Sequence, residues 1–306
     1  MVASASASSP VGAGEYAPTL AHPCGTRAVG PGTYSSVVWI VLENRSYGQV
    51  VGSASMPTLN SLARACGLAT DMHAVSHPSL PNYLAAVSGS TGGVTADCAP
   101  SACPQSRATL FSQLVAAHLS WASYEQDMRS PCQQTISYPY APKHNPAVYF
   151  PDLRSQCLAR DLPLGSVAAG PFADSLRAGT VPSFALVVPS LCDDGHDCSN
   201  AAPERWLRSW LPMIVASPQY QAGTMAVVVT YDEGVGGYAG ETCSTSADGS
   251  CRVAAVVAAA STRPGTRSAT FFSHYSLLRT TEELLGLPGH LGAAAAATSM
   301  RAAFHL

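Results

Sequence analysis

Three stretches of the chain are apolar along almost their whole length and rich in β-branched residues: Ser36–Leu42, Ser183–Val188 and Thr224–Thr230. Such continuous runs are typical of strands that are buried on both faces of a parallel sheet. Arg252–Ala258 is a weaker run of the same kind. The pattern therefore predicts four buried strands, the last of them the least pronounced.

Other stretches between these runs have the spacing of apolar and polar residues that is typical of helices. They are Pro57–Ala65, Pro81–Val87, Leu110–His118, Pro203–Val215 and Tyr275–Leu285. Strands that alternate with helices along a chain indicate an α/β fold with a mostly parallel sheet.

The length of 306 residues is enough for one large or two ordinary domains. Residues 1–33 are rich in Ser, Ala, Gly and Pro, and we interpret them as a flexible leader segment. The remainder shows no internal repeat and no charged linker, so we expect a single domain over residues 34–306. Within it, the Gly-rich stretch Gly234–Gly240 and a Cys243–Cys251 hairpin, with Asp248-Gly249 at its turn, predict an inserted surface flap.

Composition narrows the classes of function. Charged residues make up only 11% of the chain and the formal net charge is −3, whereas 47% of the residues are hydrophobic. This balance is typical of a compact globular protein and argues against disorder. Lys143 is the only lysine and no basic cluster occurs, which argues against a nucleic-acid-binding protein. Apolar runs such as Val253–Ala260 are far shorter than the ~20 residues that span a bilayer, so we expect no transmembrane segment.

The ten cysteines indicate the compartment. Most of them fall into close pairs, and Cys24 and Cys66 remain and could bond to each other. The close pairs are Cys98/Cys103, Cys132/Cys157, Cys192/Cys198 and Cys243/Cys251. None of the spacings matches a zinc ribbon, so we predict disulfides and a secreted, extracellular protein. The start of the chain lacks the charged and apolar regions of a signal peptide, and we therefore interpret the sequence as a mature form with an added initiator Met.

Acidic and amide side chains follow three of the predicted strands. These positions carry Glu43, Asn44, Asp193, Asp194, His196, Asp197, Asp232 and Glu233. In open parallel sheets, ligands bind beyond the carboxyl ends of the strands. Oxygen ligands suit a hard divalent cation such as Ca²⁺, Mg²⁺ or Mn²⁺, and His196 would also admit Zn²⁺. The alternative interpretation is that these residues cap helices or form turns.

A further candidate is Ser79, in the segment Ser76–Gly89, which we interpret as a loop followed by a helix that opens at Pro81. The free N–H groups and the dipole of a helix N-terminus favour a phosphate or an oxyanion. A serine at this place is either a helix N-cap or a nucleophile, and its position alone favours the N-cap.

Several motifs, in their order along the chain, resemble those of a phosphoesterase family that includes secreted bacterial acid phosphatases and non-specific phospholipases C. Three are shared across that family: Val41–Tyr47 (VLENRSY), His77–Leu84 (HPSLPNYL) and Tyr231–Gly234 (YDEG). Four more resemble its acid-phosphatase branch: Pro142–Val148, Cys192–Cys198, Ala202–Leu211 and Ser273–Leu278. The resemblance extends from about residue 36 to the C-terminus.

The family belongs to the alkaline-phosphatase-like superfamily, so the resemblance implies a three-layer αβα sandwich with a mostly parallel central sheet. Met56–Gly67 (MPTLNSLARACG) also resembles a segment of sulfatases. When that alignment is continued without a gap, Ser79 falls on the sulfatase nucleophile and Gly89 on the glycine that ends its helix.

The resemblance also implies roles for individual residues. Ser79 would be the nucleophile that forms a phosphoseryl intermediate. A divalent cation (Ca, Mg, Mn or Zn) would be held by Glu43, Asn44, Asp232 and Glu233. Phosphate would be bound by Asn82, Lys143, His144 and Asp194, with the Asn82 amide donating to a phosphate oxygen. His196 and His274 would protonate the leaving group or bind phosphate. Asp193 stands where the family usually has Asn.

Three functions remain open at this point. The first is a secreted, metal-dependent acid phosphatase that hydrolyses phosphate monoesters. The second is a phospholipase C-type phosphodiesterase that acts on phospholipid headgroups, although that branch carries Asn-Arg where this chain has Asn82-Tyr83. The third is a non-catalytic extracellular binding protein on the same fold. Substrates would accordingly be a small phosphate ester or a phospholipid.

His73 and His77 are interpreted as structural residues, and Trp206 and Trp210 as core.

Overall fold

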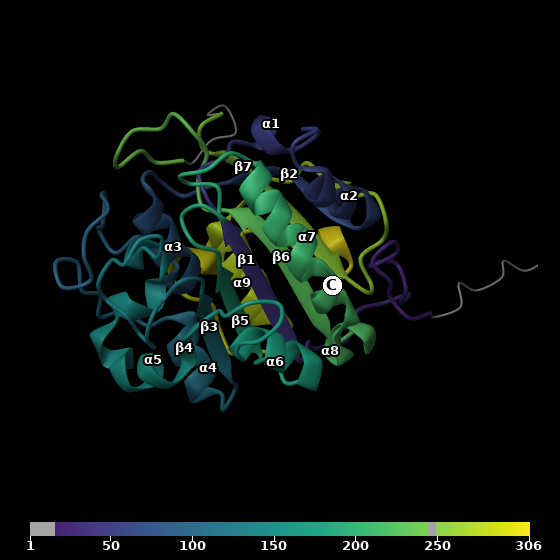
Figure 1. Cartoon of the computed structure of the whole chain (residues 1–306), viewed down its shortest axis with the longest axis horizontal. Coiled ribbons are helices and arrows are strands. Elements are labelled where there is room, and N and C mark those ends of the chain that lie inside the picture. Colours follow the sequence, from purple (N-terminus) through teal and green to yellow (C-terminus); the bar gives the residue numbers. More distant parts are fainter. Residues whose placement is uncertain (1–15, 244–248) are drawn as a thin grey trace, which may run out of the picture.

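The computed structural model describes residues 16–243 and 249–306, and within them nine strands form a single sheet (Figure 1). In chain order they are β1 (Ser36–Leu42), β2 (Gly67–His73), β3 (Trp121–Glu125), β4 (Asp161–Pro163), β5 (Phe184–Val188), β6 (Met225–Tyr231), β7 (Arg252–Ala259), β8 (Thr266–Ser268) and β9 (Phe272–Ser273). The order across the sheet is β4-β3-β5-β1-β6-β7-β2-β8, and β9 also pairs with β2.

The four strands predicted from apolar runs are confirmed to within one residue at each end, as β1, β5, β6 and β7. All strand pairs are parallel except those that β7 forms with β6 and β2. Because β7 is antiparallel to both of its neighbours, β2 runs in the same direction as β6. The carboxyl ends of β1, β2, β5 and β6 therefore lie at one edge of the sheet.

Helices cover both faces of the sheet. The α-helices are α1 (Tyr47–Val50), α2 (Pro57–Ala65), α3 (Ser79–Ser88), α4 (Leu110–Ala116), α5 (Arg154–Arg160), α6 (Pro171–Ala178), α7 (Ala201–Ala216), α8 (Pro218–Gln221), α9 (His274–Leu284) and α10 (Arg301–Phe304). Short 3₁₀ turns are η1 (Pro142–His144), η2 (Pro146–Tyr149), η3 (Pro151–Leu153) and η4 (Gly292–Ala296). Helix α7 contacts α2, α6 and α8 on one face, and α3 contacts α4 and α9 on the other (Figure 1). The predicted three-layer αβα sandwich is thus confirmed.

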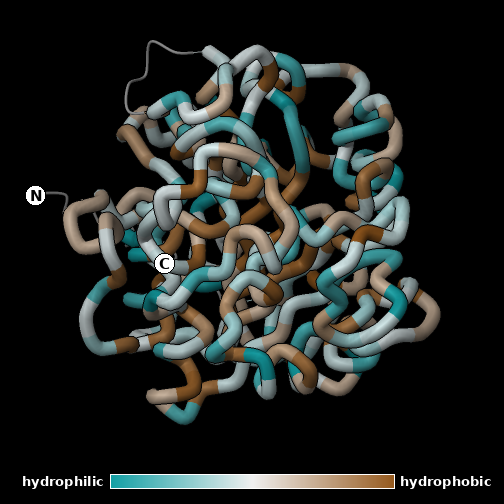
Figure 2. The backbone as a smooth tube through the Cα atoms, turned by 90° about the vertical axis from the view of Figure 1, so that its left-hand side faces the viewer, coloured by the Kyte–Doolittle hydropathy of each residue, from teal (hydrophilic) through white to brown (hydrophobic). Residues whose placement is uncertain are grey.

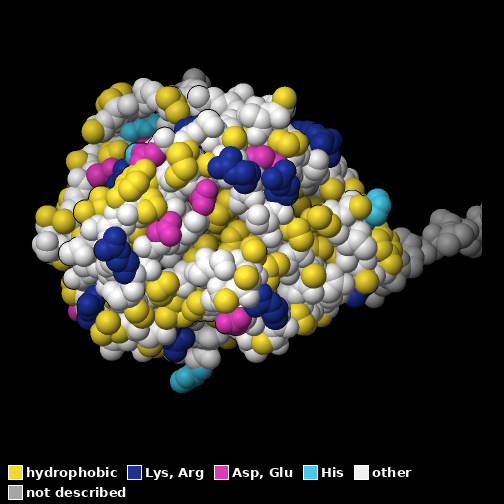
Figure 3. Space-filling model, viewed as in Figure 1, with side chains coloured by type: hydrophobic (Ala, Val, Ile, Leu, Met, Phe, Trp, Pro, Cys, Tyr) yellow, Lys and Arg dark blue, Asp and Glu magenta, His cyan; other side chains and the backbone are white. Residues whose placement is uncertain are grey.

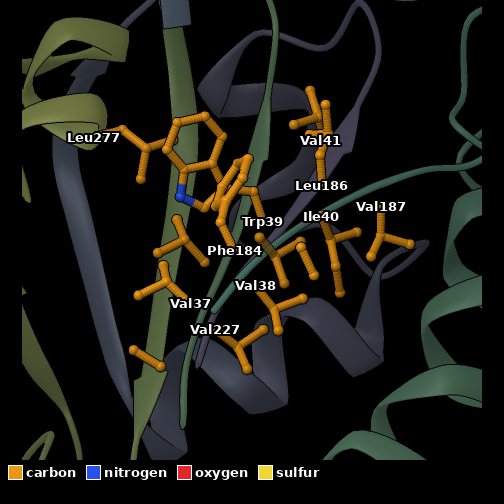
Figure 4. Close-up of a cluster of buried hydrophobic side chains, with 14 of the residues drawn as sticks. Val37, Val38, Trp39, Ile40, Val41, Phe184, Leu186, Val187, Val227 and Leu277 are labelled. Atoms are coloured by element: carbon orange, nitrogen blue, oxygen red, sulfur yellow. The ribbon is translucent and has the colours of Figure 1, made fainter. Parts of the chain in front are cut away.

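The core lies on both faces of β1, where successive side chains point in opposite directions. Figure 4 shows Trp39 beside Phe184 and facing Leu277 of α9, whereas Val38 and Ile40 lie on the other side. The Trp39 and Phe184 rings meet edge to face at 4.7 Å. In the tube of Figure 2, the brown hydrophobic stretches run mainly through the interior. The prediction that Trp206 and Trp210 belong to the core is confirmed, since both are buried.

Residues 16–33, the described part of the segment interpreted as a leader, are attached to the domain. Cys24 is buried and disulfide-bonded to Cys66. The backbone N–H groups of Thr26 and Arg27 donate to the carbonyl oxygen of Ala260 at 2.8 and 3.0 Å. The expectation of a flexible segment is therefore wrong for these residues, because a covalent bond and backbone hydrogen bonds hold them. Residues 1–15 lie outside the described residues.

All five predicted disulfides are present: Cys24–Cys66, Cys98–Cys103, Cys132–Cys157, Cys192–Cys198 and Cys243–Cys251. Asp248, at the turn of the predicted hairpin, lies outside the described residues.

On the face drawn in Figure 3, Lys and Arg side chains occur singly or in small groups. No helix in the described part of the chain is long and apolar enough to cross a membrane.

Candidate active site

Several segments that are far apart in the sequence meet at the carboxyl edge of the sheet. Strand β1 ends just before Glu43, and β6 ends just before Asp232 and Glu233. The loop after β5 brings in Asp194, and the loop after β2 leads to Ser79 at the start of α3. These segments converge because the strands share one direction. Ligand sites in open parallel sheets lie at this edge.

Ser79 is buried, and its hydroxyl points at two carboxylates. Its Oγ donates to Glu43 Oε2 at 3.0 Å and lies 3.5 Å from Glu233 Oε1. Helix α3 begins at Ser79 itself, two residues before the predicted start, and its N-cap is Pro78. The N-cap interpretation of Ser79 is therefore wrong, because its side chain faces the strand ends instead of the backbone of α3.

The carboxylates around Ser79 lie close together. Asp232 Oδ1 accepts from the backbone N–H of Asn44 at 3.2 Å, and Glu43 Oε1 accepts from the hydroxyl of Tyr83. Burial, together with the neighbouring Asp232 and Asp194, raises the pKa of Glu43 well above its ordinary value. Burial also raises the pKa of Glu233 to about 7. These raised pKa values indicate that the protein itself supplies too little positive charge around the two carboxylates.

The donor set fits a divalent cation. Among the described residues, the ion-pair partners of Glu43, Asp194 and Glu233 are histidines alone, with no Lys or Arg. Oδ2 of Asp232 is buried without a hydrogen-bond partner. Several buried carboxylates without a cation would carry a large desolvation cost. Carboxylate and hydroxyl oxygens are the ligands that hard cations prefer. Of the four predicted ligands, Asn44 contacts this group through its backbone N–H and has a left-handed φ of 47° that Asn tolerates.

His144 links two of the acids. Its Nε2 lies 3.3 Å from Glu43 Oε2, and its Nδ1 lies 3.3 Å from Asp194 Oδ2. Burial lowers the pKa of His144 to about 3, and the nearby Lys143 adds to this effect. The three side chains His144, Glu43 and Asp194 have one potential ligand atom each within 4.8 Å of the others. They form a second set that could bind a metal ion beside Ser79.

Lys143 and His196 lie together at the outer side of this cluster. Lys143 Nζ donates to Asp97 Oδ2 at 2.9 Å and lies 3.1 Å from His196 Nε2. The other nitrogen of His196, Nδ1, lies 2.6 Å from Asp197 Oδ1. The centroids of the His144 and His196 rings are 5.6 Å apart. These contacts connect the predicted phosphate-binding groups with the predicted acid.

Two roles inferred from the resemblance do not fit the contacts. Both N–H bonds of the Asn82 amide are taken, since Nδ2 donates to the carbonyl oxygens of Ser76 and Pro78 at 2.8 and 3.1 Å. The amide thus holds the loop before Ser79 and does not donate to a phosphate oxygen. His274 Nε2 lies 2.6 Å from the carbonyl oxygen of Asp232 and is buried. Burial lowers the pKa of His274 to about 4, and the contact of its Nε2 with the end of β6 favours a positioning role over the predicted role as the acid.

Sequence reasoning missed Asp97. Its Oδ1 accepts from the backbone N–H of Leu80 at 3.0 Å while Oδ2 binds Lys143. The surrounding loop offers no periodic pattern or motif that would have pointed to it. One carboxylate therefore connects the start of α3 with the only lysine of the chain.

His77 was interpreted as structural, but it contacts a predicted ligand. Its Nδ1 lies 2.5 Å from Glu233 Oε2. Burial by itself would lower the pKa of His77, but Glu233, Glu241 and Asp232 together outweigh it and raise that pKa. The Gly-rich segment covers this ring, because a Cβ at Gly237 would lie only 2.0 Å from His77 Cδ2. The place of His77 within the motif that contains Ser79 was the available signal.

Comparison with solved structures defines the class of the fold. A protein in the alkaline phosphatase superfamily from Vibrio parahaemolyticus aligns with a TM-score of 0.54 at 13% identity, over 89% of this chain and 69% of that chain. A sulfatase from a Pseudoalteromonas species aligns with a TM-score of 0.53 at 11% identity, over 84% of this chain and 68% of that chain. The fold is therefore that of the alkaline-phosphatase-like superfamily.

The sequence comparisons identify the family. The model of the Phosphoesterase family matches residues 53–288, and the chain belongs to this family. A phosphatidylinositol-3-phosphatase of Mycobacterium tuberculosis is 32% identical over 84% of this chain and 78% of its own length. Acid phosphatases of Aspergillus fumigatus and Penicillium chrysogenum are both 28% identical over 82% and 83% of this chain. The chain spans only 54% and 60% of those two relatives. The resemblance found in the motifs is confirmed, and the protein is a phosphoric ester hydrolase.

Proposed function

We propose that the protein is a secreted, divalent-metal-dependent phosphomonoesterase in which Ser79 is transiently phosphorylated. The observation that carries this proposal is the buried hydroxyl at the first residue of α3, which faces Glu43 and Glu233 from the ends of two strands. A serine beside metal-binding carboxylates is a suitable nucleophile for phosphoryl transfer. The names of the relatives, acid phosphatase and phosphatidylinositol-3-phosphatase, support a monoester as substrate.

The cation, whose identity is left open among Ca, Mg, Mn and Zn, would be held by Glu43, Asn44, Asp232 and Glu233. When bound, it lowers the pKa of a coordinated hydroxyl and neutralises charge on the phosphoryl group. The orphaned Oδ2 of Asp232 and the raised pKa of Glu43 support a cation at this place.

In the first half of the reaction, Ser79 Oγ attacks phosphorus opposite the ester oxygen. The Oγ–P bond forms and the P–O bond to the alcohol breaks. The Oγ proton leaves through the hydrogen bond to Glu43 Oε2. Lys143 Nζ, 3.1 Å from His196 Nε2, turns to the phosphoryl oxygens and stabilises their negative charge. His196 then gives its own Nε2 proton to the departing oxygen, a transfer typically worth ~10²–10⁴-fold in rate.

In the second half, a water molecule attacks phosphorus from the side that the alcohol has left. The water proton passes to His196 Nε2, the Oγ–P bond breaks, and inorganic phosphate leaves. The Ser79 hydroxyl regains its proton along the bond to Glu43. Asn82 and His274 act as positioning residues, since they hold the loop before Ser79 and the end of β6.

The decisive experiment compares Ser79→Ala with Ser88→Ala, a buried serine at the other end of the same helix. We expect Ser79→Ala to lose roughly 10⁴-fold or more in kcat, whereas Ser88→Ala stays within about tenfold of the wild type. Acid quenching during turnover followed by peptide mass spectrometry should find phosphate on Ser79. Near-normal activity of Ser79→Ala would overturn the mechanism.

A panel of monoesters, diesters and phospholipids, with and without chelator, separates this proposal from its alternatives. Faster turnover of diesters or lipids would assign the phospholipase C-type activity instead. No turnover of any ester would leave the non-catalytic binding protein.

Two further parts of the proposal rest on the fold. Five disulfides support a role outside the reducing cytosol. One sheet that draws its strands from residue 36 to residue 273 supports a single catalytic domain over residues 34–306.

A further inference from the structure

A pocket of about 620 Å³ opens beside the candidate active site. Its polar end is lined by Asp97, Lys143 and His196, and its apolar part includes Ile136, Pro142 and Leu191. Pockets of ~300–1,000 Å³ typically hold small organic ligands. Ser79 and the carboxylates around it do not line this pocket.

The polar end of the pocket adjoins the proposed nucleophile. Asp97 accepts from the N–H of Leu80, the residue directly after Ser79, and from Lys143 Nζ. His196, the proposed acid, also lines the pocket. A phosphoryl group at Ser79 therefore has its ester oxygen next to His196 and its alcohol part in the direction of the pocket.

The walls of the pocket are held in place. On one side, the Tyr140 hydroxyl donates to the carbonyl oxygen of Gln133 at 2.6 Å, and the N–H of Leu191 donates to that of Pro139 at 3.0 Å. On the other side, the Tyr149 hydroxyl donates to the carbonyl oxygen of Cys98 at 2.6 Å. The Cys98–Cys103 and Cys132–Cys157 disulfides close the two loops. Hydrogen bonds and disulfides thus hold the loops that carry the apolar surface of the pocket.

Ile136 is 68% exposed although it lines this wall. An apolar side chain that is held open at a pocket gains free energy when an apolar ligand covers it. The charges at the polar end are balanced, since Lys143 is paired with Asp97 at 2.9 Å and a protonated His196 is paired with Asp197 at 2.6 Å. Among the described lining residues, no other Lys or Arg is available for a second anionic group.

We propose that this pocket binds the alcohol part of the ester and selects alcohols that are uncharged and apolar. This inference rests on the proposed function and narrows its substrate class. A second phosphate or a carboxylate on the alcohol would meet Asp97 without a cation to pair with. An aromatic ring or an alkyl chain would cover Ile136 and Leu191.

The test compares steady-state kinetics of wild type, Ile136→Ser, Ile136→Arg and the control Leu158→Ser. Leu158 is 50% exposed on α5 and does not line the pocket. The substrates are phenyl, 1-naphthyl and 4-carboxyphenyl phosphate, and octyl phosphate distinguishes a chain from a ring. We expect Ile136→Ser to raise KM for 1-naphthyl phosphate about fivefold, with little change in kcat. Ile136→Arg should lower KM for 4-carboxyphenyl phosphate several-fold, because it supplies the missing cation.

Equal effects of the Ile136 and Leu158 variants on all substrates would overturn the inference. Binding provides a readout without turnover. In a fluorescence titration, the Kd of Ser79→Ala for 1-naphthyl phosphate should rise about fivefold when Ile136→Ser is added. If Ser79→Ala keeps its activity, the proposed function fails. If Ser79 is required but Ile136 has no effect, only the pocket inference fails.

Discussion

Asp161, at the start of β4, is a buried acid away from the candidate active site, and its neutralisation should change how stability depends on pH. Its Oδ2 accepts from Asn145 Nδ2 at 2.9 Å, and its Oδ1 is buried without a partner. Glu125, at the end of the adjacent β3, is buried too. Burial raises the pKa of Asp161 to about 7, although Asn145, the N–H of Cys132 and Arg154 oppose this. Burial and the neighbouring Asp161 raise the pKa of Glu125 well above its ordinary value.

The sign follows from proton linkage. A raised pKa means that the folded state keeps a proton that the unfolded state loses, so the stability contribution is full below about pH 4 and falls as the pH rises to about 7. At about 1.36 kcal/mol for each pKa unit, the rise from 3.8 to about 7 corresponds to about 4 kcal/mol. Asp161→Asn keeps the size of the side chain and has no charge to lose. The free energy of unfolding should therefore fall less steeply with pH in this variant than in the wild type.

Urea unfolding at several values between about pH 4.5 and about pH 7.5 measures this slope directly. We expect Asp161→Asn to exceed the wild type by a few kcal/mol at the upper end, where the wild-type contribution has been lost. The matched control is Asp174→Asn, whose side chain is 68% exposed and paired with Arg177, and its slope should equal that of the wild type. An unchanged slope in Asp161→Asn would refute the reasoning.

Three other predictions concern the cation, the core and His274. Treatment with a chelator should lower the Tm and abolish hydrolysis, because the acids around Ser79 then lack a counter-charge; calorimetry and readdition of divalent ions check this. Trp39→Phe should destabilise the fold by about 2–3 kcal/mol in urea unfolding, since it removes ring atoms from the core and the 3.0 Å hydrogen bond from Nε1 to Thr281 Oγ1. His274→Ala should slow hydrolysis of aryl and alkyl phosphates by similar factors, as expected of a positioning residue, whereas His196→Ala should slow alkyl phosphates more.

The elements that sequence reasoning located are those whose pattern is local. Ser36–Leu42 is buried on both faces, so a continuous apolar run records its environment directly. Strands β3 and β4 were not predicted because they are not continuously apolar: they carry Glu125 and Asp161, whose burial depends on partners far along the chain. The order of the sheet and the antiparallel direction of β7 depend on long-range pairing and leave no mark in a local window.

The candidate site divides along the same line. Strand-end acids such as Glu43 and Asp232 were found because strand direction determines where they lie. The role of Asn82 was misjudged, because no sequence pattern reveals that both of its amide hydrogens are used by backbone carbonyls. Asp97 was overlooked and His77 was interpreted as structural, because their partners, Leu80, Lys143 and Glu233, come from other segments. Motifs indicate which residues gather, whereas only the packed structure determines which of their atoms remain free.

The solitary lysine has a practical consequence. Apart from the α-amine at the start of the chain, Lys143 carries the only primary amine in the sequence, and its side chain is 23% exposed. An acylating reagent that attacks amines therefore modifies a single side chain, at the polar end of the pocket that Ile136 lines. A dye or isotope label attached there would report occupancy of this pocket without any cysteine having to be introduced among the five disulfides.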